Sequence, residues 1–375
     1  MKKILTGLAA FVLTLSFASA EVKFSFYNKL YEEGAVAVHD DSADETVKDF
    51  PAIREKMYAE ILTDRVDAMI EGTFAIDDFD DSHFGLQGEV DDWYIEFRPI
   101  HMITLGLHTG IFADGSYLPI WDDNVASGNI GSDGFTVTVR PVENFRISVT
   151  APFSFDGDPD GVNWVNGKEE WGEDEKFNVG FGAIFDAEFF QIGASLHDIA
   201  DSDERELGAF INIPGLFGAY KPLTVGAGFS HSWGNGELES LISVCTDTAG
   251  DGIDGGIAYK NLMNAYAELG FEKFTLTAEL AYNLGDDDHG THDIYTAASV
   301  SVTPAEKVTA TATGKLLSDF TSSSKGKVEN ILFAGFALDF DVNDNNTIGA
   351  EFDFATQDSN WAIAVPVYWK YQFEN

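Results

Sequence analysis

The sequence predicts an all-β chain that folds as a transmembrane, antiparallel, up-and-down β-barrel of about 18 strands, with about 16 as the second choice. Three observations support this prediction. Segments of about ten residues alternate apolar with small or polar residues from Val22 to Phe373. Short turns alternate with longer, acidic connections. After the N-terminal segment, no apolar run reaches the length of about eighteen residues that a membrane-spanning helix needs.

The N-terminal segment has the three parts of a secretory signal peptide. Lys2 and Lys3 form its positive start, an apolar stretch runs from Leu8 to Leu15, and Ala18-Ser19-Ala20 is a small-residue cleavage site. The apolar stretch is too short to span a bilayer. We therefore expect a cleaved signal peptide over residues 1–20, Sec-type export, and a single transmembrane barrel domain over residues 21–375.

The segment from Lys273 to Asn283 shows the strand pattern well. One face carries its apolar side chains, which are Phe274, Leu276, Ala278, Leu280 and Tyr282. The other face carries Lys273, Thr275, Thr277, Glu279 and Asn283. Successive strand side chains point to opposite faces, so this strand has an apolar side and a wet side.

The same pattern, bounded by turn residues, gives the other expected strands. They span residues 22–39, 55–62, 65–76, 89–98, 102–111, 134–140, 144–154, 176–186, 188–197, 205–213, 221–233, 261–271, 273–284, 293–303, 306–316, 328–341, 345–356 and 360–373. The first segment is longer than a single crossing needs. An even number of strands leaves both termini on the periplasmic side.

The longer connections lie between the short turns. They span residues 40–54, 77–88, 113–133, 155–175, 198–204, 234–260, 286–292, 318–326 and 357–360. We interpret Glu237 to Thr246 as part of an outer loop, with a loop hairpin as a further interpretation. Strict alternation of short and long connections is typical of outer-membrane barrels, whose short turns are periplasmic and whose long loops lie outside. A soluble sandwich gives no reason for this alternation, although its solvated face would have the same polar rows.

The charge balance excludes one class of partner. The chain has 22 Lys and Arg against 63 Asp and Glu, a net charge of −41. Nucleic acid is itself polyanionic, so we expect no nucleic-acid partner. The single Cys245 cannot form an internal disulfide.

The two expected faces differ in the way that a water-filled barrel requires. The apolar row of the last strand ends in aromatic residues, with Trp361 at one end and Trp369 and Tyr371 at the other. Trp and Tyr favour the two membrane interfaces, and outer-membrane lipid is the expected partner of this face. The opposite rows, such as that from Thr224 to Ser232, are small and polar, which keeps a lumen of this size open.

The terminal segment from Ala362 to Phe373 resembles the last strand of bacterial outer-membrane porins, and the pattern of the whole chain is similar to theirs. The resemblance implies that Trp369, Tyr371 and Phe373 form the signal that the barrel-assembly machinery recognises. Glu374 follows Phe373, which departs from the strict pattern, and Pro366 predicts a bulge. Trimers are common in the family, so the resemblance also implies a homotrimer.

In classical porins the third outer loop folds inward and narrows the pore, and the resemblance transfers this role to residues 113–133. That connection contains Trp121, Asp122 and Asp123. Arg65 and Arg146 lie on the polar face and could oppose these acids across a constriction. The alternative is that the loop lies outside and that the arginines lie near the periplasmic rim. Arg98 and Arg140, which directly precede turn prolines, fit the rim better.

We expect no cofactor, and calcium is the one alternative, because one loop matches the start of a calcium site. Asp156, Asp158 and Asp160 place oxygens at alternate positions, with Gly161 at the sharp turn. The twelfth position is Gly167 instead of a bidentate Glu, so the match is incomplete. Solvated acidic loop residues are the alternative.

These features predict a porin, a water-filled channel for passive diffusion of small hydrophilic solutes that prefers cations because of the acidic loops. A substrate-specific uptake channel and a surface adhesin presented on a β-barrel remain as alternatives. We find no H-E-x-x-H, G-x-S-x-G or phosphate-loop motif, and we expect no enzymatic activity.

Overall fold

The computed structural model describes residues 23–33, 36–39, 46–48, 52–78, 85–107, 134–152, 179–187, 189–197, 199, 205–215, 222–244, 252–284, 292–319 and 329–374. Residues 1–20, the expected signal peptide, lie outside them. The strands are β1 Lys23–Glu33, β2 Val36–His39, β3 Thr46–Lys48, β4 Ala52–Leu62, β5 Val66–Asp78, β6 Gly85–Ile100, β7 Ile103–Leu107, β8 Gly134–Val142, β9 Phe145–Pro152, β10 Gly180–Ala187, β11 Phe190–His197, β12 Glu206–Ile213, β13 Leu223–Val244, β14 Ile253–Phe271, β15 Phe274–Asn283, β16 Ile294–Ala305, β17 Val308–Asp319, β18 Glu329–Asn343, β19 Asn346–Gln357, β20 Asn360–Ala364 and β21 Pro366–Glu374. The described part of the chain has no helix of sufficient length and apolarity to cross a membrane.

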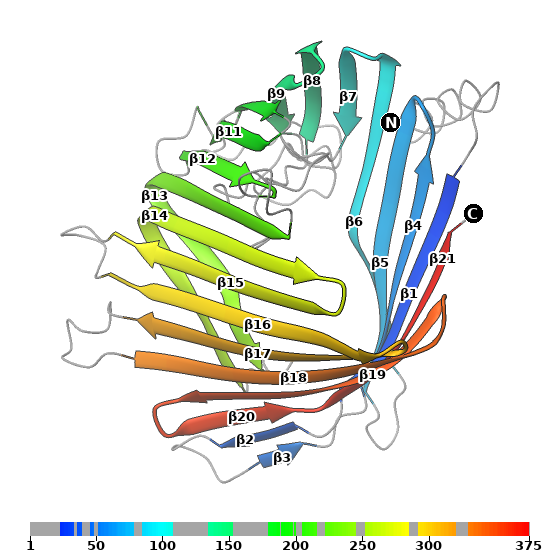
Figure 1. The fold of residues 1–375 in the computed structure, drawn as a ribbon, viewed down its shortest axis with the longest axis vertical. Coiled ribbons are helices and arrows are strands. Elements are labelled where there is room, and N and C mark those ends of the chain that lie inside the picture. The colour runs from blue at the N-terminus through cyan, green and yellow to red at the C-terminus, as the bar shows by residue number, and fades with distance from the viewer. Residues whose placement is uncertain are drawn as a thin grey trace, which may run out of the picture.

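The strands pair antiparallel in chain order, and the pairing returns to its starting point (Figure 1). β1 pairs with β4, and the ladder continues strand by strand from β4 to β19. β19 pairs with β20 and β21, and β21 pairs with β1. With β20 and β21 taken as one strand interrupted at Val365, the ring formed by the described residues contains eighteen strands. The predicted barrel class and strand number are confirmed.

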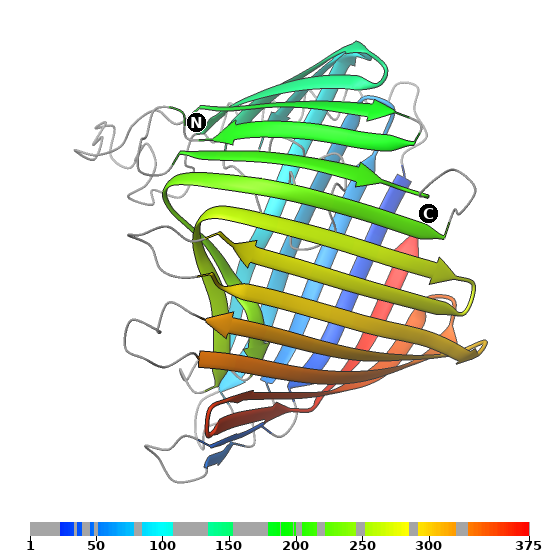
Figure 2. The ribbon, with the colours of Figure 1, turned by 60° about the vertical axis from the view of Figure 1, so that its left-hand side comes forward.

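The short turns lie together at one end of this ring. Glu272-Lys273, Glu306-Lys307 and Asp344-Asn345 connect β14 to β15, β16 to β17 and β18 to β19, and Figure 2 shows these three turns on the same side of the barrel. We call this the short-turn end and the other the long-connection end.

The N-terminal prediction of one strand over residues 22–39 is right in sheet position and wrong in continuity. β1 pairs with β21 and β4, and β2 continues along the same line, pairing with β20 and β3 (Figure 1). Glu33 pairs with Pro366 and Ala37 with Ile363, so the register shifts by one residue where the strand is interrupted. A membrane crossing needs only about 9–11 residues, so β1 is long enough to complete it.

Two local predictions near the C-terminus are also wrong. The expected longer connection at residues 357–360 is a turn of Asp358 and Ser359, with Asp358 in the left-handed region at a φ of 55°. Pro366 marks no bulge, because Asp353 pairs with Ala364 and Ala350 with Val367 in one unbroken register. Proline removes one N–H from the ladder here without adding a residue.

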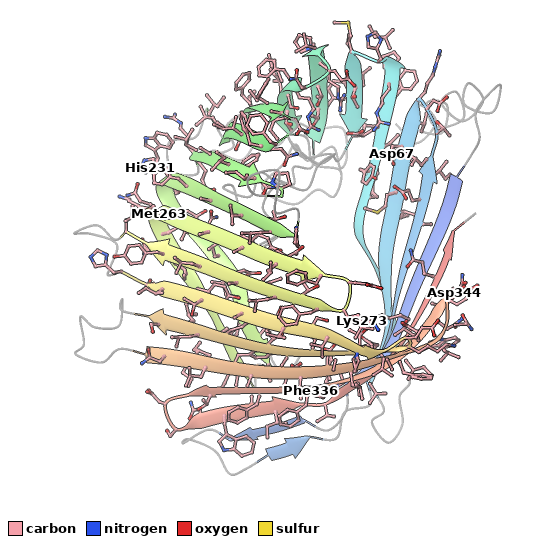
Figure 3. The ribbon with its side chains drawn as sticks, viewed as in Figure 1. Asp67, His231, Met263, Lys273, Phe336 and Asp344 are labelled. Carbon is pink, nitrogen blue, oxygen red and sulfur yellow. The ribbon has the colours of Figure 1, made fainter. Side chains whose placement is uncertain are left out.

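The outer face of the ring is apolar and exposed, as a lipid-facing surface must be. Its large exposed side chains include Phe181, Phe185, Ile192, Ile211, Met263, Leu280, Leu332, Phe336, Leu338, Ile348, Phe352 and Val367. Figure 3 labels Met263 and Phe336 among them. The inner face carries hydroxyl pairs between neighbouring strands, such as Thr138 with Ser148 at 2.8 Å and Thr277 with Ser299 at 2.6 Å. Side-chain alternation therefore separates an apolar exterior from a polar lumen.

This separation predicts opposite effects for one substitution at adjacent positions. Phe336 is 51% exposed on the outer face of β18, and Ala337 lines the lumen. Phe336→Arg places a charge in hydrocarbon at a cost of about 2–4 kcal/mol, so folding into lipid vesicles should fall. Ala337→Arg, the control, should fold as the parent does. Equal folding yields for the two variants would show that the faces are wrongly assigned.

Candidate functional site

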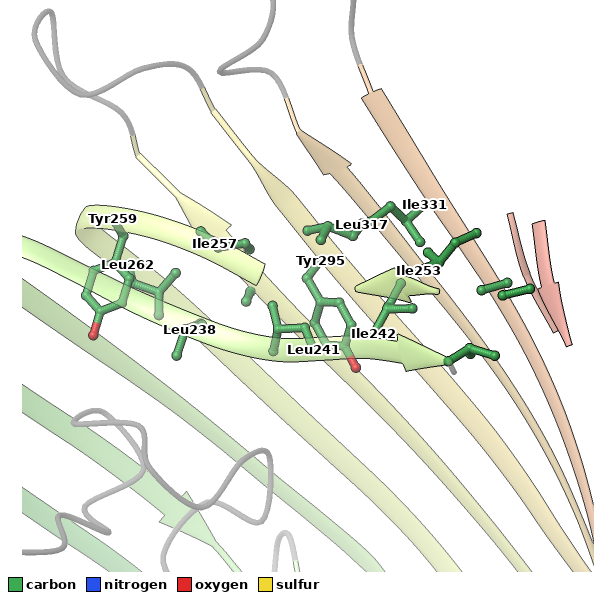
Figure 4. Close-up of a cluster of buried hydrophobic side chains, with 14 residues drawn as sticks. Leu238, Leu241, Ile242, Ile253, Ile257, Tyr259, Leu262, Tyr295, Leu317 and Ile331 are labelled. Carbon is green, nitrogen blue, oxygen red and sulfur yellow. The ribbon is translucent and has the colours of Figure 1, made fainter. Parts of the chain in front are cut away.

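The lumen contains a hairpin that the sequence analysis placed in an outer loop. Residues 223–233 of β13 and 261–271 of β14 belong to the wall, but both strands continue past it. Residues 236–244 pair with residues 253–259 to form this extension, which we call the inner hairpin (Figure 4). The prediction that Glu237 to Thr246 lie in an outer loop is therefore wrong for residues 237–244, which belong to β13 and lie inside the barrel. The interpretation of this segment as a hairpin is right for these residues.

Two bulges in β13 separate the inner hairpin from the straight part of the wall. His231 pairs with Asn261 and Gly236 with Tyr259, so residues 232–235 face Lys260 alone. Further on, residues 239–241 face Gly256 alone. Extra residues on one strand bend it and increase its twist. These bulges account for the change in direction that takes the hairpin inward.

An apolar cluster fixes the inner hairpin to the inside of the wall. Its hairpin members are Leu238, Leu241, Ile242, Val244, Ile253, Ile257 and Tyr259. Its wall members are Leu262, Ala281, Tyr295, Leu317, Ile331, Ala355 and Ala362, which come from β14 to β20 (Figure 4). All are almost fully buried. The wall members lie near the long-connection end, where the lumen-facing rows change from polar to apolar.

Polar contacts and one glycine complete this attachment. Lys315 Nζ donates to the Leu241 carbonyl at 3.1 Å, and Asn283 Nδ2 donates to the Ala258 carbonyl at 2.9 Å. Gly255 packs so closely that a Cβ there would lie 2.8 Å from Leu317 Cδ2 and still nearer to Ile331 Cδ1. A side chain at Gly255 is therefore incompatible with this packing.

Next to the inner hairpin lies a lumen cavity of about 490 Å³. Ser243 contributes from the hairpin, and the wall contributes charged and polar side chains: Thr311, Thr313, Lys315, Asp339, Glu351, Asp353, Tyr368 and Lys370. The cavity thus has three carboxylates and two ammonium groups. It contains both signs of charge with an excess of acid.

Both lysines of the cavity, Lys315 and Lys370, already contact side chains of the protein. Lys370 Nζ lies 3.9 Å from Asp339 Oδ1 and 4.3 Å from the centre of the Tyr368 ring. The Tyr368 hydroxyl donates to Asp339 Oδ1 at 2.6 Å, and its ring occupies the space that a Cβ on Gly349 would need. Lys315 Nζ lies 5.2 Å from the Phe333 ring centre.

Glu351 and Asp353 are adjacent on the lumen face of β19. In the described part of the chain, no basic side chain forms an ion pair with either of them. Lys315 interacts electrostatically with Asp353 from two strands away. These two carboxylates are therefore the acidic groups of the cavity most available to a passing solute.

The predicted pore residues lie elsewhere or outside the described residues. Arg65 is exposed in the turn between β4 and β5, and Arg146 lies on the lumen face of β9, directly after a short turn. Both lie at the short-turn end, away from the inner hairpin. Trp121, Asp122 and Asp123 lie outside the described residues. Their role as a constriction stays a prediction.

The other arginines considered for the pore also lie at the short-turn end. Arg98 Nη2 pairs with Glu96 at 3.0 Å and lies 3.8 Å from Asp67. The Arg140 guanidinium donates to the Thr104 hydroxyl. The rim interpretation of these two residues fits the structure better than a constriction role.

The expected assembly signal lies in β21. Trp369 is 48% exposed on the outer face of β21 and donates from Nε1 to Asn346 Oδ1 at 3.0 Å. Tyr371 shares that strand, and Phe373 pairs with Phe26 of β1. The assembly-signal role stays a prediction. The calcium residues Asp156, Asp158 and Asp160 lie outside the described residues, among which no cluster of metal-ligating side chains occurs.

The structure resembles solved outer-membrane proteins. It matches OpdK of Pseudomonas aeruginosa, in the structure solved with vanillate, at 12% identity and a TM-score of 0.57, over 95% of this chain and 99% of that one. The fold is that of an outer-membrane porin barrel. OccK2 (OpdF) of the same bacterium matches this porin fold at 8% identity and a TM-score of 0.58, covering 94% of this chain and 98% of that one.

OccAB4 of Acinetobacter baumannii has the same porin fold, with 7% identity, a TM-score of 0.55, and coverage of 96% of this chain and 99% of that chain. No protein-family model and no curated protein matches the sequence. The likeness therefore lies in the barrel architecture.

The packing at Gly255 gives a test of the inner hairpin. Gly255→Val should push the hairpin off the wall, because its side chain would overlap Ile331 and Leu317. We expect a changed single-channel conductance and more current noise in planar bilayers. Gly314→Val is the control, since a Cβ there meets only the Phe333 carbonyl at 4.0 Å. A parental current trace for Gly255→Val would contradict the described packing.

Proposed function

We propose that this chain is a porin: a water-filled outer-membrane channel, with no enzymatic activity, for passive diffusion of small hydrophilic solutes. The observation that carries the proposal is the inner hairpin, which narrows a polar lumen beside a charged cavity while the outer face stays apolar. A barrel that only displayed loops would need no polar, partly open interior. The expected signal peptide over residues 1–20 agrees with export to the outer membrane.

The proposed mechanism is sieving by lumen width combined with an electrostatic bias. Asp339, Glu351 and Asp353 outnumber the two lysines of the cavity, and Asp339 is the only one of the three carboxylates within ion-pairing distance of a described basic side chain. Carboxylates along a pore raise the local concentration of cations and lower that of anions. Passage therefore favours cations, and it needs neither an energy source nor a cofactor.

Planar-bilayer recording tests the channel and its charge preference separately. The full chain, folded and inserted, should give stable conductance steps, and a salt gradient should give a reversal potential of the sign expected for cations. A sealed bilayer from correctly folded protein would refute the channel. Conductance with an anionic reversal potential would refute only the cation preference.

The carboxylates of β19 predict where the preference arises. Glu351→Gln and Asp353→Asn, singly and together, should lower the cation-to-anion permeability ratio, because each removes an acid from the cavity lining. Asp344→Asn is the matched control, since Asp344 is exposed in the short turn after β18 (Figure 3). A ratio that falls as far in the control as in the β19 variants would place the selectivity outside the cavity.

A substrate-specific uptake channel is the second candidate. The cavity size and its combination of Lys315, Lys370 and the ring of Tyr368 favour it, since such a site could hold a small charged, ring-bearing solute. OpdK has been solved with vanillate, which makes vanillate a suitable probe. Flux into liposomes that saturates with vanillate would support this candidate, and linear flux would favour passive diffusion.

A further inference from the structure

A second group of functional side chains lies on the outside of the barrel at the long-connection end, over β12 to β16. It consists of Arg205, His231, Trp233, Asn261, Tyr282 and His292, which we call the rim cluster. Strand pairing places its members side by side: Trp233 N–H donates to the Arg205 carbonyl at 2.9 Å, and His231 pairs with Asn261. His231 marks the position of the cluster in Figure 3.

The rim cluster is ordered by its own contacts. The Arg205 guanidinium carbon lies 5.5 Å from the centre of the Trp233 ring, and that ring meets His231 edge-on at 4.5 Å. His231 Nδ1 and Asn261 Oδ1 are 2.8 Å apart. On the neighbouring strands, the Tyr282 hydroxyl lies 2.8 Å from His292 Nδ1, and the two rings stack.

Arg205 has hydrogen-bonding capacity that the protein does not use. Its Nη2 donates to the Ile199 carbonyl at 2.8 Å, but its Nε is buried without a hydrogen-bond partner. Among the described residues no carboxylate forms an ion pair with it. A guanidinium is always charged and matches the geometry of phosphate. The buried Nε is not accessible to a ligand, so an oxyanion would be held by the charge of the guanidinium and by its other N–H groups.

The surroundings identify the source of that oxyanion. Directly towards the middle of the barrel, the same outer face carries the exposed apolar side chains Ile211, Met263 and Leu280. Trp233, which is 43% exposed, and Tyr282 lie nearer to the long-connection end than these apolar residues. Trp and Tyr in such a position are typical of the headgroup region of a membrane. A solute inside the lumen cannot reach this face, whereas a lipid phosphate lies at this depth.

We propose that the rim cluster binds the phosphate of an anionic lipid in the outer leaflet, with Arg205 as its charged contact and Trp233 and Tyr282 against the headgroup. Charge complementarity favours this occupant, because the cluster places on the lipid face a cation that forms no ion pair with a carboxylate of the described residues. The site is separate from the lumen and does not depend on the proposed channel.

Native mass spectrometry of the full chain in neutral detergent tests the proposal, with phosphatidylglycerol as the probe. The parent should retain one phosphatidylglycerol more tightly than phosphatidylcholine with the same acyl chains. Arg205→Gln should weaken retention about fivefold, the effect of one cation at the membrane surface. Lys273→Gln is the matched control, because Lys273 lies at the opposite end of the same strands (Figure 3) and should bind as the parent does.

Three results would overturn the proposal. In the first, Arg205→Gln retains phosphatidylglycerol as well as the parent does. In the second, Lys273→Gln loses as much retention as Arg205→Gln. In the third, inorganic phosphate binds as tightly as the lipid, which would indicate a free-anion site. An unchanged circular dichroism spectrum of Arg205→Gln shows that the barrel is intact. Should that variant fail to fold, Trp233→Leu, which removes the ring over the guanidinium, should retain the lipid less well than the parent. Parental retention by Trp233→Leu would refute the proposal.

Discussion

The structure depends on one constraint: inside a bilayer, each backbone N–H and C=O must find a partner within the protein. A β-chain meets this constraint only when its last strand pairs with its first. Here β21 pairs with β1 over nine residue pairs, from Ser25 with Glu374 to Glu33 with Pro366. The expected assembly signal lies in this last strand, so the strand that completes the ladder is also the one that the assembly machinery is expected to recognise.

Completing the ladder leaves the inside of the barrel free of the lipid constraint. Water can satisfy polar groups there, so the lumen accepts hydroxyl ladders, charged side chains and irregular backbone that the outer face could not contain. The inner hairpin uses this freedom. Its apolar side chains find a dry surface only because the wall beside it becomes apolar at the same level, at Ala281, Tyr295 and Leu317. The cluster therefore acts as a small hydrophobic core within an aqueous channel.

The sequence was sufficient for the parts of the fold that follow from alternation. Period-two patterns located almost every wall strand, and Pro, Asn and Asp located the turns, because lipid imposes a strict apolar row on each crossing. The sequence was not sufficient to place the inner hairpin inside the barrel. Leu238, Leu241, Ile242 and Val244 are an apolar signal in an otherwise acidic connection, but they match no regular period since a bulge lies between them. The cavity could not be predicted either, because it depends on where Ser243 meets the distant β17 to β21.

The bulge at residues 232–235 connects the lumen and the rim. His231, directly before it, and Trp233, within it, still lie beside the β12 side of the wall, and their side chains face outward next to Arg205. After it, the strand has left the wall, and Leu238 packs against the inside of the barrel. Without the extra residues, we expect β13 to continue straight along β12 and β14 past the end of the wall. The inner hairpin would then not enter the lumen. The first of the two register shifts of β13 thus lies where the wall strand ends at the aromatic rim and the inner hairpin begins.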